Sequence, residues 1–167
     1  MEKVSAPGRL AKSYSLFPLY RSRSAKFFEV RLSYMKLIIY TDGGARGNPG
    51  PAAIGVVVGD KEYGESIGKT TNNIAEYSAL IFALEKARQL IGKEKAKGTD
   101  IEVRSDSELM VSQLNGEYKV KDDDLKPLFI EVWNLKQDFG SVIFKHVRRE
   151  ENKRADALVN RALDTLI

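Results

Sequence analysis

The sequence predicts an α/β fold for residues 35–167, with a five-stranded mixed sheet flanked by helices. Three β-prone runs come first and are joined by short loops, which is typical of an antiparallel meander. Two further strands alternate with helices, and parallel strands need such helical crossovers. A chain of 167 residues buries enough surface for one core but rarely for two. We therefore expect one domain with three antiparallel and two parallel strands.

The first three strands are marked by apolar and β-branched runs that end at turns. Residues 37–40 form the first run, which we expect to end at Asp42 and the two glycines that follow it. The second strand covers residues 54–58, and a short turn leads from it into a third strand at 63–68. Asp42 is thus expected at the end of the first strand.

The later elements follow from the spacing of apolar residues. Tyr77, Leu80 and Leu84 recur at a helical spacing and begin a stripe that ends at Ile91. In chain order, the elements expected after this helix are a lysine-rich loop at 93–98, a strand at 101–106, a helix at 108–114, a helix at 125–139, a strand at 142–147 and a helix from about residue 152 to 166.

Residues 1–34 carry the basic charge of the chain. They hold seven Lys or Arg and two Asp or Glu, and the remaining residues hold 20 basic and 21 acidic side chains. The pI of about 9.2 therefore says little about the main domain. We interpret this segment as a disordered basic arm, or as the product of a start codon assigned too early, with Met35 as the true start. The alternatives are an organellar transit peptide and an arm that adds affinity for nucleic acid.

The composition excludes several kinds of site. The sequence has no cysteine, which excludes disulfides, thiolate metal sites and cysteine nucleophiles. Its one histidine, His146, excludes a metal site built on several imidazoles. No apolar run reaches the roughly 18–20 residues of a membrane-spanning helix, so we expect a soluble protein, with the cytoplasm as its compartment. Metal chemistry must then rest on carboxylates.

Four carboxylates occupy positions that bring distant segments to one edge of the sheet. Asp42 and Asp106 each end a predicted strand, and neighbouring parallel strands end at the same edge. Glu76 and Asp156 lie in the first turns of two helices. A ligand set made only of oxygen atoms favours Mg²⁺ or Mn²⁺. Each acid also has an ordinary structural interpretation, as a turn residue, a helix cap, a capping box with Asn73 or a partner of the helix dipole.

Five motifs occur in a fixed order along the chain. They are Tyr40-Thr41-Asp42-Gly43-Gly44, Gly47-Asn48-Pro49-Gly50-Pro51, Thr70-Thr71-Asn72-Asn73-x-x-Glu76, Asp106-Ser107 and Asn152-x-x-Ala155-Asp156. In these motifs residues 36–167 closely resemble type 1 ribonuclease H, and most of all its short archaeal and bacterial branch. The resemblance implies a ribonuclease H-like fold, in agreement with the mixed sheet predicted from the strand pattern.

The resemblance implies an endonuclease that cuts the RNA strand of an RNA/DNA hybrid and leaves 5′-phosphate and 3′-hydroxyl ends. It implies two Mg²⁺ ions, with Mn²⁺ as an alternative, and no covalent enzyme intermediate. Asp42 then bridges both ions, and Asp156 holds the ion on the side of the nucleophile. Glu76 and Asp106 hold the ion on the side of the leaving group. We expect the protein to be a monomer.

The same resemblance assigns contacts with the hybrid. The main chain of Gly43, Gly44, Ala45 and Arg46 and the side chains of Asn48, Asn72 and Asn73 match the residues that recognise RNA 2′-hydroxyl groups in the minor groove. Thr71 matches a contact with a DNA phosphate, at a helix N-terminus that suits an anion. Helix capping is the structural alternative for the two adjacent asparagines, and the two roles are compatible.

Two features depart from the family pattern. Many larger relatives carry a basic helical protrusion where this chain has residues 115–124. We interpret Lys119 and Lys121 in this stretch as solvated loop lysines, with phosphate contact as the alternative. Many relatives also carry a histidine before the last acid. His146 has a comparable spacing, but the alternation of apolar residues places it in a strand, so Arg149 is the better candidate for binding a phosphate there.

Two other functions stay open at this point. A nuclease of the same superfamily that also cuts double-stranded RNA would use a similar groove and the same 2′-hydroxyl groups. A catalytically silent module that binds hybrids is the alternative outside the enzymes. The silent module is disfavoured because a binding protein has no need for four acids that repel one another.

Overall fold

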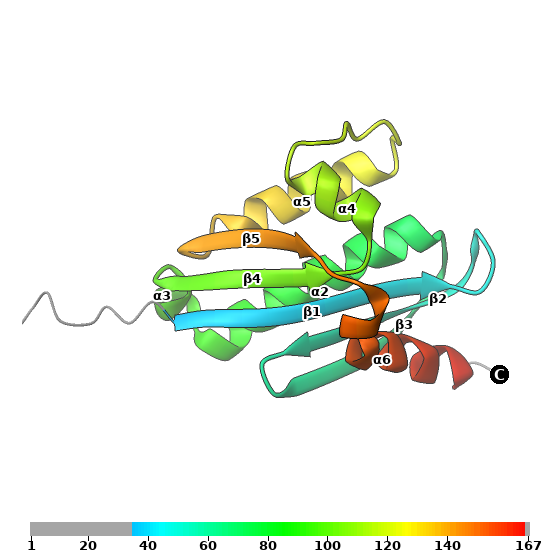
Figure 1. Cartoon of the computed structure of the whole chain (residues 1–167), viewed down its shortest axis with the longest axis horizontal. Coiled ribbons are helices and arrows are strands. Elements are labelled where there is room, and N and C mark those ends of the chain that lie inside the picture. The colour runs from blue at the N-terminus through cyan, green and yellow to red at the C-terminus, as the bar shows by residue number, and fades with distance from the viewer. Residues whose placement is uncertain (1–34, 166–167) are drawn as a thin grey trace, which may run out of the picture. The chain divides into compact units, whose positions relative to one another are not determined.

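One five-stranded sheet organises residues 35–165, the part of the chain that the computed structural model describes. Its strands lie in the order β3-β2-β1-β4-β5 (Figure 1). The strands are β1 (Met35–Ala45), β2 (Gly50–Val58), β3 (Lys61–Thr70), β4 (Thr99–Ser105) and β5 (Ser141–His146). The helices are α2 (Asn72–Ile91), α3 (Lys93–Ala96), α4 (Glu108–Leu114), α5 (Leu125–Lys136) and α6 (Lys153–Asp164), with a short 3₁₀ helix, η1 (Arg149–Glu151), before α6. The interpretations of residues 1–34 concern a segment outside the described residues.

The sheet is mixed, as the sequence predicts. β1 pairs antiparallel with β2, and β2 pairs antiparallel with β3, which forms the expected meander. β4 pairs parallel with both β1 and β5. The crossovers that parallel pairing requires run through α2 and α3, and through α4 and α5. The predicted fold class is confirmed.

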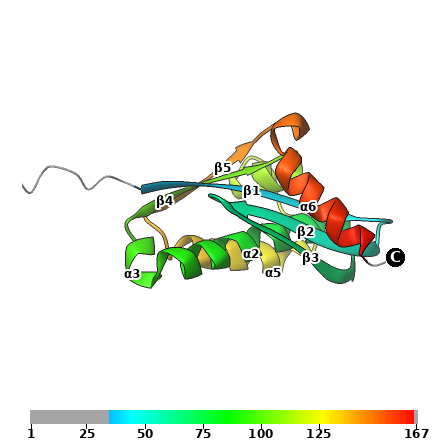
Figure 2. The ribbon, with the colours of Figure 1, turned by 90° about the horizontal axis from the view of Figure 1, so that it is seen from below.

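Helices cover both faces of the sheet (Figure 2). α2 packs on β1 and β2, and α5 packs on α2, so both helices lie on one face. The main core lies between them and the sheet, with Tyr77, Leu80 and Leu84 of α2 against Ile39 and Ile101 of the strands. α6 lies on the other face, over β1, β2 and β3. None of the helices in the described range combines the length and the apolar character that crossing a membrane would require.

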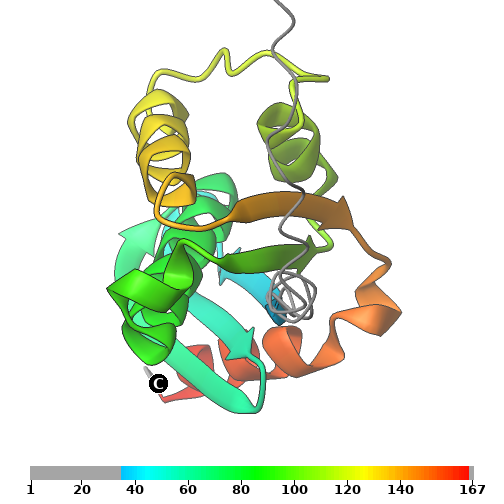
Figure 3. The ribbon, with the colours of Figure 1, turned by 90° about the vertical axis from the view of Figure 1, so that its left-hand side faces the viewer.

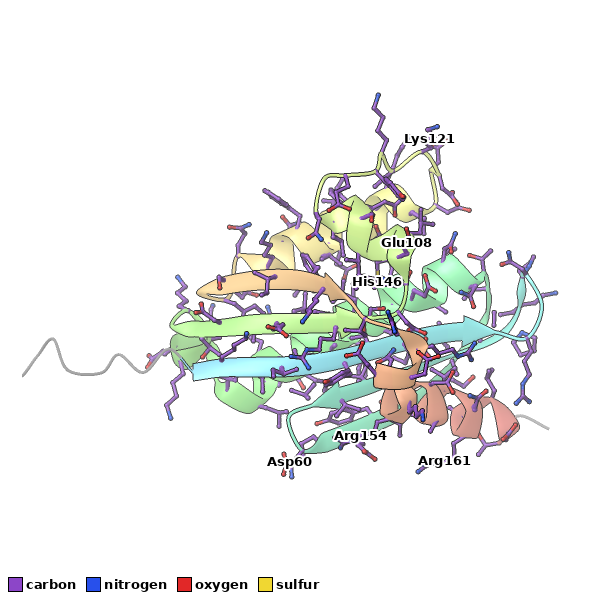
Figure 4. The ribbon with its side chains drawn as sticks, viewed as in Figure 1. Asp60, Glu108, Lys121, His146, Arg154 and Arg161 are labelled. Carbon is purple, nitrogen blue, oxygen red and sulfur yellow. The ribbon has the colours of Figure 1, made fainter. Side chains whose placement is uncertain are left out.

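α4 and α5 stand beside β5 at one edge of the sheet, and residues 115–124 connect them (Figure 3). These ten residues contain no helix, so the stretch where larger relatives carry a protrusion is an extended loop here. Lys119 and Lys121 are both exposed in it, and Lys121 lies at its outer edge (Figure 4).

The first strand is longer than the sequence suggested, and the turn expected after Asp42 is absent. Residues 42–45 remain in β1 because they pair with residues 52–55 of β2. The turn lies instead at residues 46–49, and β2 begins four residues earlier than predicted. The pairing of β1 with β4 nevertheless ends at Thr41. The prediction that the first strand stops at the aspartate was therefore wrong for the β2 side and right for the β4 side.

Several other boundaries also differ from the sequence prediction, including the following two. Residues 93–96 form the short helix α3 instead of a loop, because Gly92 turns the chain with a positive φ of 86° and Ala96 is buried. α5 ends at Lys136, three residues before its predicted end. Phe139 is still buried, in the turn that leads to β5.

Candidate active site

Asp42 and Asp106 follow the last pair of residues that joins β1 to β4. That pair is Thr41 and Ser105, so each strand places an aspartate directly beyond it. On the other side of β1, Asp42 pairs with Gly55 of β2. The two aspartates therefore lie at one edge of a parallel strand pair, where α/β sheets usually bind ligands.

Gly43 allows α2 to approach β1 closely. A Cβ atom on Gly43 would lie 2.2 Å from the carbonyl carbon of Ala75, far inside the distance that Cβ atoms adopt in proteins. Only glycine fits at such a close approach of two backbones. Because Glu76 follows Ala75 in α2 and Asp42 precedes Gly43 in β1, this contact brings the Glu76 carboxylate close to Asp42.

Gly55 has the same role on the other face of the sheet. A Cβ atom on Gly55 would lie 2.1 Å from the carbonyl oxygen of Ala155 in α6. Asp156 follows Ala155, and Gly55 is itself the β2 partner of Asp42. Two glycines beside one aspartate thus bring in one acid from each of two helices.

All four predicted acids line one pocket of about 280 Å³. Its wall comes from β1, α2, the end of β4, η1 and α6. The sequence-predicted residues on this wall are Asp42, Gly43, Gly44, Ala45, Arg46, Asn72, Glu76, Asp106, Arg149 and Asp156. The other described residues that the sequence singled out lie outside the wall, among them Asn48, Thr71, Asn73 and His146. His146 is the exposed last residue of β5, which agrees with its predicted place in a strand (Figure 4).

Glu76 accepts hydrogen bonds at both of its carboxylate oxygens. Asn72 Nδ2 donates to Oε1 at 3.0 Å, and the Ser107 hydroxyl donates to Oε2. Burial raises the pKa of Glu76; the Ser107 hydrogen bond opposes this rise, and the nearby charge of Asp106 adds to it. Ser107 also caps α4 by accepting a hydrogen bond from the backbone N–H of Met110 at 3.3 Å. The cap of α4 is therefore Ser107, not Asp106.

Asp106 is held by an asparagine from the segment between η1 and α6. Asn152 Nδ2 donates to Asp106 Oδ1 at 2.7 Å and to the backbone oxygen of Thr41 at 3.0 Å. Asn152 is only 1% exposed, so these bonds connect α6 rigidly to the end of the β1–β4 pair.

Asp156 receives a donor at each carboxylate oxygen. Arg149 Nη2 lies 2.6 Å from Oδ1, and Asn160 Nδ2 lies 3.0 Å from Oδ2. The Arg149 side chain is 73% exposed, so this ion pair is accessible to solvent. Hydrogen bonding to Asp156 raises the pKa of Arg149, which stays charged.

Asp42 has the least compensated charge of the four acids. Within residues 35–165 no side chain donates a hydrogen bond to it, and the backbone N–H of Gly43 is the group that lowers its pKa. Burial, followed by the charges of Asp106, Asp156 and Glu76, raises the pKa of Asp42 from 3.8 to about 7. In the protein without a cation, the pocket therefore disfavours the ionised form of its central carboxylate.

The wall of the pocket offers oxygen atoms to a metal ion. Within the described residues, no three Asp, Glu or His side chains are gathered closely enough to hold one ion together. Each of the three outer acids is bound by donors of its own. Glu76 accepts from Asn72 and Ser107, Asp106 accepts from Asn152, and Asp156 accepts from Arg149 and Asn160. The carboxylate oxygens of the four acids are nevertheless ligands that a hard divalent cation prefers. A bound cation would also relieve the unfavourable charge on Asp42.

The residues predicted to contact nucleic acid lie partly on the pocket wall, as Gly43 to Arg46 and Asn72 do, and partly outside it, as Asn48, Thr71 and Asn73 do. Thr71 caps α2 by accepting a hydrogen bond from Ile74 N at 3.4 Å, so the alternative interpretation of Asn73 and Glu76 as a capping box is wrong. Asn48 Oδ1 accepts a hydrogen bond from the backbone N–H of Asn72 at 3.2 Å, which connects the turn at residues 46–49 to the start of α2.

Three residues on the pocket wall were missed in the sequence. Val159, Asn160 and Leu163 come from α6 and follow Asp156 by three, four and seven positions. Residues at these spacings share one face of a helix, so the pattern could have identified them once Asp156 was placed. The donor roles of Ser107 and Asn152 depend on the tertiary fold, and no local pattern predicts them.

Comparisons with known proteins agree with this geometry. Residues 40–162 match a family model described as reverse transcriptase-like. The solved structure of LC11-RNase H1, a protein isolated from compost by a metagenomic approach, contains an RNA/DNA hybrid. It is 49% identical to this chain with a TM-score of 0.74, over 78% of this chain and 98% of that one.

Two curated relatives extend the comparison. Ribonuclease HI of Halobacterium salinarum is 47% identical over 131 residues, which are 75% of this chain and 63% of that protein. A bifunctional protein of Mycobacterium tuberculosis is 40% identical over 137 residues, which are 78% of this chain and 36% of that protein. The chain thus spans less than two thirds of either relative. The matched family model, the 49% identical structure and the shared fold together show that this chain belongs to the ribonuclease H family, among its type 1 members.

Proposed function

We propose that this protein hydrolyses the RNA strand of RNA/DNA hybrids. The observation that carries the proposal is the pocket in which Asp42, Glu76 and Asp156 of β1, α2 and α6 meet Asp106, which directly follows β4. Four carboxylates that repel one another destabilise a free protein, so their presence favours catalysis over passive binding. The hybrid in the LC11-RNase H1 structure supports the choice of substrate.

Two divalent cations, Mg²⁺ or Mn²⁺, are the cofactors that this pocket would take. Asp42 would bridge both ions, Asp156 would hold one of them, and Glu76 and Asp106 would hold the other. When bound, the ions supply activation of a water molecule and stabilisation of the leaving 3′ oxygen. The expected products are a 5′-phosphate and a 3′-hydroxyl end.

The chain's own residues have two further tasks in this proposal. Arg149 is exposed beside Asp156 and is positioned to bind a phosphate of the RNA strand, although its guanidinium stays charged and does not act as a base. The main chain of residues 43–46, which lines the pocket, would recognise RNA 2′-hydroxyl groups. The side chains of Asn48, Asn72 and Asn73 would contribute to this recognition.

Cleavage of end-labelled substrates tests the proposal. The substrates are an RNA/DNA hybrid, an RNA/RNA duplex, a DNA duplex and single-stranded RNA, each with Mg²⁺, Mn²⁺ or EDTA. We expect cutting of RNA in the hybrid, dependent on a metal ion and absent from Asp42→Asn. Additional cutting of the RNA/RNA duplex would widen the substrate class. Folded protein that binds the hybrid but cuts nothing with either metal would contradict the proposal and favour a binding module.

The end chemistry and the assembly state have separate tests. Ligation of the products to a 3′-hydroxyl acceptor succeeds only if cleavage leaves a 5′-phosphate. Light scattering should give the mass of one chain if the protein is a monomer, as we expect from the sequence. A cytoplasmic location is likewise our expectation, based on a sequence without cysteine.

A further inference from the structure

Each of the three outer acids of the pocket is held by the side-chain amide of an asparagine. In every case the donor is Nδ2 and the acceptor is a carboxylate oxygen. The pairs are Asn72 with Glu76 at 3.0 Å, Asn152 with Asp106 at 2.7 Å and Asn160 with Asp156 at 3.0 Å. Two of these asparagines belong to the sequence motifs described above, whereas Asn160 does not.

Asn160 holds Asp156 from within the same helix. It lies four positions after Asp156 in α6, and residues at this spacing are neighbours on a helix surface. Its Nδ2 atom donates both to Asp156 Oδ2 at 3.0 Å and to the Asp156 backbone oxygen at 2.9 Å. The amide is thus fixed to the helix backbone and to the carboxylate at once, which restricts the rotation of the Asp156 side chain. Asn160 also lines the pocket.

The chemistry of the donor matters because Asp156 carries a charge that a cation would use. An amide donates a hydrogen bond but has no charge, so it orients the carboxylate and leaves its negative charge in place. A lysine at the same position would orient the carboxylate as well, but would also neutralise it and compete with a metal ion. Arg149 already contributes one positive charge, at Oδ1.

We propose that Asn160 is a positioning residue, which holds the Asp156 carboxylate toward the pocket while leaving its charge available to a divalent cation. This inference rests on the proposed function, since it concerns the same metal site. It predicts that loss of the Asn160 amide weakens the binding of the cation and leaves the affinity for nucleic acid unchanged.

The first test compares Asn160→Ala with the wild type in two measurements. One is the Mg²⁺ concentration that gives half-maximal cleavage, and the other is the Mg²⁺-dependent rise in melting temperature without nucleic acid. We expect Asn160→Ala to need roughly tenfold more Mg²⁺ in both, because residues that orient metal ligands typically contribute 10–100-fold. Its melting temperature in EDTA should not fall, since alanine is the better helix former.

Asn134→Ala is the matched control. Asn134 is an exposed asparagine within α5 and lies outside the pocket wall. The same substitution there should leave both Mg²⁺ midpoints unchanged. A general effect of replacing a helical asparagine would appear in both variants, whereas loss of a positioning amide appears only at Asn160.

Two further substitutions separate the amide from the size of the side chain. Asn160→Gln keeps the amide, and glutamine also bonds to an aspartate at helical spacing, so it should recover most of the Mg²⁺ affinity. Asn160→Lys keeps a donor but adds a charge, so its Mg²⁺ midpoint should exceed that of the alanine variant. A lysine variant that binds Mg²⁺ as well as the wild type would overturn the proposal.

The kinetics distinguish positioning from contact with the substrate. A raised KM for the hybrid with an unchanged Mg²⁺ midpoint would overturn the proposal and make Asn160 a nucleic-acid contact. Unchanged behaviour of Asn160→Ala in every measurement would overturn it as well. If the wild type binds Mg²⁺ but cuts no hybrid, the proposed function fails, whereas a loss of the thermal shift in Asn160→Ala would still support the role of Asn160.

Discussion

Asp42 and Glu102 are carboxylates on adjacent parallel strands, yet their surroundings shift their pKa values in opposite directions. Glu102 pairs with Ile38 of β1, four residues before Asp42, so both acids belong to the same face of the sheet. The Glu102 side chain is 6% exposed, and Lys36 at 2.5 Å and Arg104 at 2.6 Å bind it. Hydrogen bonds from these two cations lower the pKa of Glu102, whereas burial and three carboxylates raise the pKa of Asp42 to about 7.

Glu102 therefore stabilises the fold, whereas the ionised form of Asp42 destabilises it. Glu102 is buried, but its charge is balanced by two cations, as buried charges in proteins usually are. Within the described residues no basic side chain forms an ion pair with Asp42, because Arg149 on the same pocket wall pairs with Asp156 instead. The charges of three further acids act on Asp42. The same chain that balances one buried carboxylate leaves the other unbalanced. Such an exception is expected at a functional site, where a ligand supplies the missing charge.

The largest expected effect is on cleavage. Asp42→Asn should reduce hydrolysis of the RNA/DNA hybrid to background, because the amide removes the charge that would hold the cations. Glu102→Gln should cut at close to the wild-type rate, since Glu102 lies outside the pocket wall. Initial rates with Mg²⁺ measure both. If both variants lost activity equally, Asp42 would not differ from Glu102 in its importance for cleavage.

The second effect is on stability: Asp42→Asn, which loses activity, should gain stability. The folded pKa of Asp42 is about 7 against an ordinary 3.8, so ionisation reduces the stability of the folded state as the pH rises from about 4 to 7. A shift of about three pKa units corresponds to at most about 4 kcal/mol. The variant should therefore be more stable than the wild type at pH 8 and about equally stable at pH 4. Urea unfolding in EDTA measures both differences.

Excess Mg²⁺ provides the control for this effect. If a cation balances the charge on Asp42, Mg²⁺ stabilises the wild type and not Asp42→Asn. The stability difference between the two proteins at pH 8 should then become smaller. An Asp42→Asn protein that is less stable than the wild type at pH 8 without metal would show that Asp42 does not carry a strained charge.

A third prediction concerns the glycine that faces Asp42 in β2. In Gly55→Ala the new Cβ atom would clash with the Ala155 carbonyl oxygen, so α6 must shift and carry Asp156 away from the pocket. Such overpacking costs roughly 3 kcal/mol, and cleavage should fall with it. Gly98→Ala is the control, because its nearest neighbour would be 3.7 Å away. Thermal unfolding and cleavage rates should be changed only in Gly55→Ala.

The fourth effect is the stability of Glu102→Gln. Lys36 and Arg104 keep a hydrogen-bond acceptor but lose the opposite charge, which should cost about 1–2 kcal/mol. The folded pKa of Glu102 lies below its ordinary 4.5, so its contribution is present above about pH 4.5 and is lost as the pH falls through the folded value. In urea unfolding, the stability difference between Glu102→Gln and the wild type should be smaller at pH 3 than at pH 7.

The smallest effect is expected from an exposed ion pair. Arg154 of α6, which is labelled in Figure 4, binds Glu62 of β3. The two charged groups are 2.8 Å apart, and the side chains are 59% and 40% exposed. Pairs of this kind contribute about 1 kcal/mol or less, and salt screens them. Arg154→Ala should therefore change the melting temperature little, and the change should shrink at high salt. If Arg154→Ala lost as much stability as Glu102→Gln, burial would not determine how much these two ion pairs contribute to stability.

Local patterns were sufficient for the fold and for the place of the acids. Alternating strands and helices predicted the mixed sheet, and the helical stripe that begins at Tyr77 predicted α2. The end of β1 was misplaced because glycines usually mark turns, whereas Gly43 and Gly44 lie inside a strand. Here the missing side chains make room for α2 and α6 rather than for a turn.

The surroundings of the acids could not be predicted in the same way. Ser107, Asn152 and Asn160 donate to acids that reach them only through the tertiary fold or through the chosen rotamer. Asn160 had a helical spacing to Asp156, which suggests neighbours but does not indicate a hydrogen bond. The charge balance of Glu102 likewise depends on strand register, since Lys36 lies on a different strand.

The close contact between Gly55 and Ala155 also bears on when the protein becomes active. It joins residues that are 100 positions apart in the chain, and contacts of such separation require the closure of a long loop. A chain in which α6 has not docked lacks Asp156 at the pocket, and Asp106 lacks its donor Asn152. If the proposed function holds, molecules in which α6 is not docked would not cut RNA, and cutting would be confined to chains that have completed their fold.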